Sequence, residues 1–234
     1  SMAFILPIEE PWTSQPQVAV GVDWSNPLAN GIVGTVSGIG FDAVKNIPIT
    51  TNQVTSTARG RLFLFNGSNL IQTQHPRVSG AFSVSFTILY KYAGVSRQSY
   101  VTQGGATSSG KGWSIGAPGG TTGIDLVFGG VAQYILSSTG LTDGKTHRVT
   151  VSISGNNGSA ILYIDGVFKG SSAVGTVLTP SSKETAIGAG HNGTAYVDYA
   201  ITGTGINDVI VRNKNINASL ALEDYINPWQ IFAP

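Results

Sequence analysis

The chain has 234 residues, 41% of them hydrophobic and 11% charged, with a formal net charge of +1 at pH 7. This length fits one domain with a sizeable core, and the 13 Lys and Arg residues are too scattered to predict a nucleic-acid groove. The absence of cysteine excludes disulfides and thiolate metal sites, and no apolar run approaches the ~20 residues of a membrane helix.

The first 35 residues differ in composition from the rest of the chain. They are rich in proline, carry Trp12 and Trp24, and lack helical or strand periodicity. Proline fixes φ and removes a backbone donor, which favours an extended segment. We therefore expect an N-terminal arm over residues 1–35, anchored by the two tryptophans on a domain formed by residues 36–234.

Short predicted strands separated by turns follow from residue 61 onward. The clearest covers residues 81–92, where Ser83, Ser85 and Thr87 mark a polar face. The opposite face carries Phe82, Val84, Phe86, Ile88, Tyr90 and Tyr92. Other strands are predicted over residues 62–65, 98–103, 112–115, 124–128, 132–136, 185–188, 195–201 and 206–212.

Residues 141–170 carry the strongest local signal. Val149, Val151 and Ile153 alternate with polar residues, which predicts a strand with one buried face. A turn over 155–159 and a second strand over 161–164 follow. Asp165-Gly166 then predicts a tight hairpin, because both residue types tolerate positive φ.

One helix is expected near the C-terminus. Asn217 or Ser219 can cap it, residues 220–226 have helical apolar spacing, and Pro228 ends it. The apolar residues 229–232 are expected to pack back on the core. The whole pattern indicates an all-β, two-sheet antiparallel sandwich of the jelly-roll type, with one short C-terminal helix.

The order of these segments resembles the laminin-G-like, concanavalin A-like jelly roll. The resemblance covers roughly residues 60–228 and lies in the successive strands at 82–90, 141–154, 160–170, 185–190 and 205–213. The Asp-Gly hairpin typical of that family is kept at Asp165-Gly166, whereas Thr146 stands where the family's Trp-His pair has its tryptophan. The resemblance implies a concanavalin A-like sandwich.

The two ends of the chain are similar to laminin-G-like proteins encoded in phages and prophages. The similar segments are PWTSQPQVAVGVDWSNPLANGIV at the front and YINPWQIF at the back. This narrower resemblance implies a virion-associated protein, such as a tail or receptor-binding accessory or a head decoration. It implies a virion or extracellular location, with other virion proteins or further copies of the chain as partners.

Catalytic residues are not expected. Some enzymes of this fold place closely spaced carboxylates on one strand, and retaining hydrolysis needs two of them about 5–5.5 Å apart. The four glutamates, Glu9, Glu10, Glu184 and Glu223, belong to no such pattern. No G-x-S-x-G elbow is present either. We therefore expect a protein that is not an enzyme and needs no cofactor.

An essential metal is not expected. Many relatives hold calcium through carboxylates and carbonyl oxygens, and Asp125, Asp198 and Asp208 are possible ligands here. They lie on different predicted strands and form no D-x-D-x-D loop. We expect Asp208 to cap backbone groups and Asp125 to face solvent.

Glycan binding is the remaining function, and the loop at residues 189–196 is the best candidate site. It places His191, Asn192 and Tyr196 within six residues on a glycine-rich loop, and such groups bond sugar hydroxyls. Trp113 and Tyr100 are further candidates for stacking on a pyranose ring, with core packing as the alternative for each.

The leading hypothesis is a non-enzymatic virion protein whose lectin-like sandwich binds a host-surface glycan or a partner virion protein. The alternatives are a bacterial extracellular carbohydrate-binding module and, less favoured because the carboxylate pattern is missing, a glycoside hydrolase of the same fold. Repeated copies on an oligomer would compensate for weak single sugar contacts.

Overall fold

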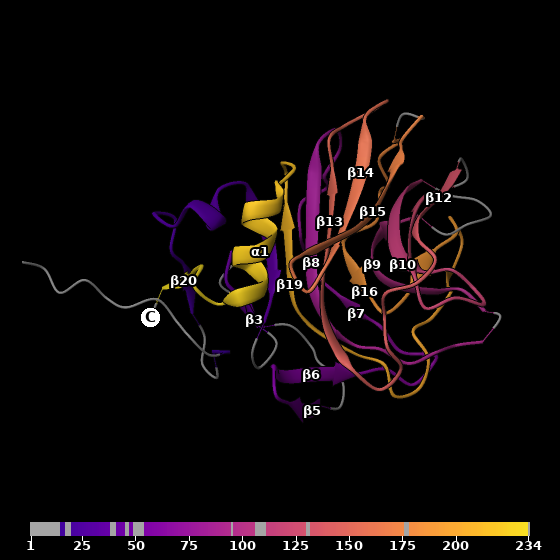
Figure 1. Ribbon diagram of the computed structural model, residues 1–234, viewed down its shortest axis with the longest axis horizontal. Coiled ribbons are helices and arrows are strands. Elements are labelled where there is room, and N and C mark those ends of the chain that lie inside the picture. The colour runs from indigo at the N-terminus through magenta and orange to yellow at the C-terminus, as the bar shows by residue number, and fades with distance from the viewer. Residues whose placement is uncertain are drawn as a thin grey trace, which may run out of the picture.

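The protein is an antiparallel sandwich of two large sheets (Figure 1). The computed structural model describes residues 15–16, 20–37, 41–44, 47–48, 54–94, 96–105, 111–129, 132–175 and 178–233. Within them the long strands pair antiparallel, and α1 (Ala218–Ile226) is the one α-helix. The predicted all-β fold of two sheets with a short C-terminal helix is confirmed.

The first large sheet has six strands. In spatial order they are β12 (Ala132–Ser137), β11 (Ile124–Phe128), β10 (Gly112–Ala117), β9 (Gln98–Gly104), β16 (Ala186–Ile187) and β7 (Ile71–Gln72). β16 and β7 are only two residues long, and the predicted strand over 195–201 is reduced to β18 (Tyr196–Val197), because Asp198 has a φ of +52°.

The second large sheet has eight strands. Its order is β15 (Val167–Ala173), β14 (Ser159–Ile164), β13 (Thr146–Ile153), β8 (Phe82–Leu89), β19 (Gly205–Arg212), β6 (Gly60–Leu64) and β5 (Val54–Thr57), with β2 (Ile32–Val36) also paired to β19. Three short pairs and a 3-10 helix complete the fold: β1 (Gly21–Val22) with β20 (Phe232–Ala233), β3 (Phe41–Asp42) with β4 (Ile47–Pro48), β17 (Gly190–His191) with β18, and η1 (Pro27–Ala29).

The main hydrophobic core lies between the two large sheets. The apolar face predicted for β8 is buried from Phe82 to Tyr90, and Phe82 packs against Trp113 of the six-stranded sheet with ring centroids 5.1 Å apart. Tyr92 departs from the prediction, because β8 ends at Leu89 and the Tyr92 side chain is 45% exposed.

The Asp165-Gly166 hairpin forms as predicted. Both residues have positive φ, +52° and +74°, as a primed turn requires. The Asp165 carboxylate then joins the turn to β13: it accepts a hydrogen bond from the Arg148 backbone N–H at 2.8 Å, and its other oxygen lies 2.8 Å from Nδ1 of His147.

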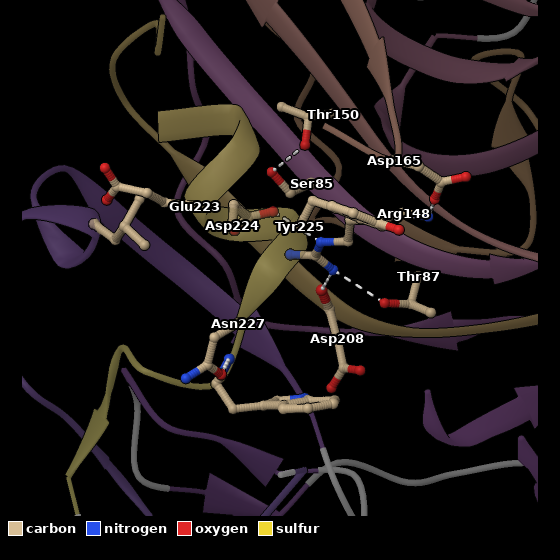
Figure 2. A network of polar contacts seen from close by, with 12 residues as sticks. Ser85, Thr87, Arg148, Thr150, Asp165, Asp208, Glu223, Asp224, Tyr225 and Asn227 are labelled. Atoms are coloured by element: carbon tan, nitrogen blue, oxygen red, sulfur yellow. Dashed lines mark hydrogen bonds and ion pairs between the residues drawn. The ribbon is translucent and has the colours of Figure 1, made fainter. Parts of the chain in front are cut away.

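The polar face of β13 and β8 is buried as well as the apolar face. The alternation of residues predicted that only the apolar face would be buried. α1 covers the face of the eight-stranded sheet that points away from the main core (Figure 1). Arg148 Nε and Arg212 Nη2 lie 2.8 and 3.2 Å from the two carboxylate oxygens of Asp224 on α1. Figure 2 shows Arg148 of β13 reaching Thr87 on the adjacent β8 and the Asp208 carbonyl on β19, the next strand beyond it. The polar face is therefore the interface with the helix.

The two ends of the chain pack together beside this helix. Val22, Leu28, Ile231 and Phe232 are buried in a second hydrophobic cluster, and β1 pairs with β20. The predicted inward packing of residues 229–232 is confirmed. Trp24 is 61% exposed, so the prediction that it anchors the N-terminal segment is wrong. Trp12 lies outside the described residues, and β2 crosses the predicted end of the arm at residue 35.

The helix begins and ends as predicted. The Asn217 side chain caps it by accepting a hydrogen bond from the Leu220 backbone N–H at 3.0 Å, and Pro228 follows its last turn. α1 has nine residues, and no helix in the described part of the chain has the length and apolarity to cross a membrane.

Candidate functional site

Three of the predicted glycan-binding residues lie together in the β17–β18 hairpin. The His191 and Tyr196 rings meet edge to face with centroids 4.9 Å apart. Nδ1 of His191 accepts the Gly193 backbone N–H at 2.9 Å, and Asn192 Oδ1 accepts backbone N–H groups of the same turn. The Tyr196 hydroxyl accepts a hydrogen bond from Gln72 Nε2 at 2.8 Å. These contacts hold the loop in one conformation and order its polar side chains.

A pocket of about 290 Å³ lies against this hairpin. Its described lining combines two lysines, two serines, the His191 side chain and a glycine: Lys111, Ser181, Ser182, Lys183, His191 and Gly193. The lining therefore comes from three separate places in the chain, just before β10, just before β16 and in the β17–β18 turn. The pocket can offer ammonium, imidazole and hydroxyl groups to a ligand.

Close backbone packing brings these segments together. Gly112 donates its backbone N–H to the Thr179 carbonyl at 2.7 Å, which ties the start of β10 to the segment before β16. Gly104 and Gly112 have φ of +80° and +94°, and a Cβ on either would lie under 3.0 Å from atoms of Ser181. Glycine at both positions lets Ser181 reach the floor of the pocket.

The described lining of the pocket carries two ammonium groups, those of Lys111 and Lys183, and no carboxylate. Burial lowers the pKa of His191, and the charge of Lys183 lowers it further. The ring is therefore neutral near pH 7, and because Nδ1 accepts a backbone hydrogen bond, its proton resides on Nε2. Outside the lining, Arg77 Nη2 donates to the Ser182 carbonyl at 3.0 Å and adds a third cation to the neighbourhood of the two lysines.

The two other predicted stacking residues are not at the surface. Trp113 and Tyr100 both have 0% exposure, so neither ring can stack on a sugar, and the alternative of core packing is correct for both. The Trp113 indole N–H instead donates to Gln103 Oε1 at 3.2 Å. Gln103 also donates to Thr185 Oγ1 and the Pro76 carbonyl, so Trp113 supports the segments around the pocket from below.

A second hollow, of about 660 Å³, lies at the other end of the six-stranded sheet. Its described lining includes Arg97, Gln133 and Ile135. Arg97 makes a bidentate contact with Asp125 at 2.7 and 2.8 Å, and Gln133 bonds the same carboxylate at 2.6 Å. Asp125 has 0% exposure, so the prediction that it faces solvent is wrong. The carboxylate already neutralises the cation of this hollow.

The three aspartates considered as metal ligands are engaged with protein groups. Asp198 lies 3.6 Å from Arg97, the partner of Asp125. The buried Asp208 carboxylate accepts hydrogen bonds from the side chains of Ser37 and Gln15 instead of capping backbone groups as predicted. Among the described residues, no three metal-ligating side chains come together.

The sequence did not predict that lysines and serines would line the pocket. The basic residues are scattered along the chain, and Lys111 and Lys183 are 72 positions apart. The one local signal is the Ser181-Ser182-Lys183 triplet after Pro180, whose composition indicates a polar loop. Nothing in a single sequence indicates that this loop lies beside the start of β10.

A sequence profile and several solved structures are similar to this chain. The profile of a laminin-G family, described as the concanavalin A-like lectin/glucanases superfamily, matches residues 65–214. The binding domain of Paraclostridial Mosquitocidal Protein 1 has a TM-score of 0.62 at 12% identity, over 85% of this chain and 52% of that chain. The present chain therefore spans about half the length of that toxin domain.

Two further structures extend the comparison. Domain 4 of AbnA, an extracellular arabinanase from Geobacillus stearothermophilus, in complex with arabinotriose, has a TM-score of 0.60 at 19% identity, over 82% of this chain and 97% of that domain. The receptor binding domain of botulinum neurotoxin type G has a TM-score of 0.57 at 15% identity, over 84% of this chain and 51% of that one. These identities show a shared fold. No curated protein sequence matches the chain.

Proposed function

Because the chain belongs to the concanavalin A-like lectin/glucanases superfamily, we propose that it is a non-enzymatic, lectin-like protein of a bacteriophage virion. Its ligand is a host-surface glycan or a partner virion protein. The observation that carries the binding role is the pocket beside His191, where side chains with hydrogen-bonding groups converge on a hollow of about 290 Å³. That volume suits a single sugar unit of a longer chain.

The structural neighbours support a sugar as the ligand. One of them is an arabinanase domain in complex with arabinotriose, and two others are named as binding domains of toxins. A shared fold does not identify a ligand, so the proposal that this chain binds a sugar must also rest on the residues of the pocket. The pocket residues support a sugar as the ligand, because a few polar groups on a rigid hairpin are the usual means of fixing a sugar's orientation.

The engagement of the buried carboxylates supports a protein without hydrolase activity. Asp125, Asp208 and Asp224 each accept hydrogen bonds from side chains, and Asp125 and Asp224 also pair with arginine. A glycosidase needs one carboxyl group to give up a proton and another to attack or to activate water. Carboxylates held by arginine are poorly suited to either task.

The virion assignment rests on the terminal segments, which resemble those of laminin-G-like phage proteins, and on the weakly charged surface. The alternative of a bacterial extracellular carbohydrate-binding module is favoured by the likeness to AbnA domain 4, of which 97% is covered. The neighbouring genes separate the two: capsid and tail genes support the virion protein, and genes for secreted polysaccharide-degrading enzymes support the module.

A glycan array with the whole chain tests the binding role. We expect at least one glycan to bind, with binding lost in Ser182→Leu, which fills the exposed mouth of the pocket without removing a side-chain hydrogen bond. Phe168→Leu, an exposed position on β15 of the other sheet, is the control and should bind as the wild type does. The role is wrong if Ser182→Leu binds normally or if no glycan binds, and release of reducing ends from a polysaccharide would overturn the non-enzymatic assignment.

A further inference from the structure

We propose that the pocket beside His191 recognises an anionic group on its sugar, a carboxylate or an ester sulfate, in place of a neutral ring. This inference rests on the proposed glycan binding and names the chemical class of the glycan. It follows from the charges in the lining of the pocket and from the lack of a carboxylate partner for them among the residues that the structure describes. Neutral sugars should bind this pocket much more weakly.

Cations gather at this pocket although the chain has few of them. Only 13 of 234 residues are Lys or Arg, yet Lys111 and Lys183 line the pocket, and Arg77 is hydrogen-bonded to the carbonyl of Ser182. Ammonium groups that converge on one hollow attract an anion, and their field is stronger where the protein excludes water. None of the described lining residues is acidic.

The described residues supply no counter-ion for these lysines. Within the described part of the chain, neither Lys111 nor Lys183 lies within 4.0 Å of a carboxylate, and Glu184, next to Lys183 in the sequence, has an exposed side chain. The hollow at Arg97 is the opposite case, since Asp125 makes a bidentate pair with that guanidinium. An external anion can therefore pair with the lysines of the pocket beside His191, whereas Arg97 in the other hollow is already paired with Asp125.

Neutral donors around the lysines complete an anion site. Because Nδ1 of His191 accepts the Gly193 N–H, Nε2 carries the ring proton and is a donor. The Ser181 and Ser182 side chains add hydroxyl donors, and Ser181 is buried at the floor. Carboxylate and sulfate oxygens accept several such bonds at once, whereas a neutral hydroxyl accepts fewer and more weakly.

Titration calorimetry with matched sugars tests the proposal. Trigalacturonate and its methyl ester have the same rings and linkages and differ in charge, and galactose 6-sulfate against galactose makes the corresponding pair for sulfate. We expect the charged member of at least one pair to bind about tenfold tighter or more, since bonds to ionic groups are the stronger ones. The pair that shows the difference identifies the anion. Its affinity should fall as NaCl rises from about 50 to 300 mM, because salt screens exposed charges.

Lysine variants locate the effect. In the double variant Lys111→Gln with Lys183→Gln, the preference for the charged sugar and the salt dependence should both disappear. Lys169→Gln removes one positive charge from the exposed β15 on the other sheet and should leave both unchanged. His191 ring resonances followed by NMR should shift on addition of the charged sugar to the wild type and stay in place in the double variant.

The outcomes separate this inference from the proposed function. Equal binding of charged and neutral members, or charged-sugar binding that survives the double lysine variant, overturns the anion site and leaves glycan binding standing. An equal loss in Lys169→Gln shows a nonspecific charge effect and also overturns it. If neither these sugars nor any glycan of the array binds, both the inference and the glycan-binding role are wrong.

Discussion

At the scale of the residue, burial decides which aromatic and histidine side chains can meet a ligand. His191 and Trp113 were both candidates by residue type, yet one lines a pocket and the other lies between the sheets with no exposed surface. The difference arises from the pleat: Trp113 lies on the face of β10 that packs against Phe82. Residue type therefore indicates a capacity for sugar binding, and position in the fold decides whether it is available.

Trp113→Phe should lower stability without changing sugar binding. The smaller ring leaves a void and removes the hydrogen bond to Gln103, which together cost about 1–3 kcal/mol of unfolding free energy. Urea denaturation followed by tyrosine fluorescence or circular dichroism measures the loss, and the glycan array measures binding. Tyr92→Phe, at an exposed ring, should change stability by less than about 0.5 kcal/mol. A selective loss of glycan binding in a fully stable Trp113→Phe protein would contradict the core assignment.

At the scale of the element, single polar side chains hold strands and turns in register. Asp165 has the left-handed φ that the hairpin requires and also bonds the Arg148 N–H and the His147 ring of the adjacent strand. Burial alone would raise the pKa of Asp165, but these hydrogen bonds and the charges of His147 and Arg59 outweigh it and hold that pKa below its usual value. The folded state therefore favours the ionised form.

Asp165→Asn should weaken the acid sensitivity of the fold. Because the pKa of Asp165 is depressed in the folded state, the carboxylate stabilises the protein above the unfolded pKa of about 3.9 and loses this effect as pH falls through the folded pKa. The variant keeps a residue that tolerates positive φ but has no carboxylate to titrate. As the pH is lowered from about 6 to about 2.5, the midpoint temperature of thermal unfolding should fall less in the variant than in the wild type. Asp143→Asn, at an exposed aspartate, is the control. A decline as steep as that of the wild type would be the contrary result.

At the scale of the whole molecule, the central strands β13, β8 and β19 of the eight-stranded sheet are buried on both faces. One face meets the six-stranded sheet across the main core, and the other meets α1 and the paired ends of the chain (Figure 1). The interface with α1 contains charged side chains: Asp224 of α1 pairs with Arg148 of β13 and with Arg212 of β19. Burial would raise the pKa of Asp224, but the two arginine charges outweigh it and lower that pKa. The helix is thus attached through one carboxylate to two strands.

Asp224→Ala should destabilise the whole fold strongly. It leaves two buried guanidinium groups without their counter-ion, and breaking such a buried ion pair costs about 3–5 kcal/mol. Guanidinium chloride unfolding should show the loss, and amide exchange should accelerate first in α1. Glu223→Ala, the adjacent exposed acidic residue of the same helix, should change the unfolding free energy by less than about 0.5 kcal/mol. Similar losses in both variants would show that any loss of negative charge from α1, and not the ion cluster in particular, is responsible.

Local signals accounted for most of the fold and for part of the candidate site. The Asp165-Gly166 turn, the Asn217 cap and the apolar face of β8 depend on neighbouring residues, so they could be predicted. The burial of Arg148 and Arg212 could not, because an alternating strand has the same pattern whether its polar face meets water or a helix. The prediction for Trp24 failed for a related reason: its residue type favours burial, but Val22 and Leu28 of the same segment are the residues buried in the second hydrophobic cluster.

The two-sheet sandwich, the hairpin, the capped helix and the His191 loop could be predicted from the sequence, because each depends on spacing and turn chemistry over a few residues. Which side chains surround that loop depends on how distant segments pack in the folded protein. Lys111 and Lys183 are far apart in the chain and line the same pocket because Gly104 and Gly112 allow the Ser181 segment to pack against the β9–β10 end. Charge acts through space and not along the chain, so a sequence with scattered basic residues can still fold into a positively charged pocket.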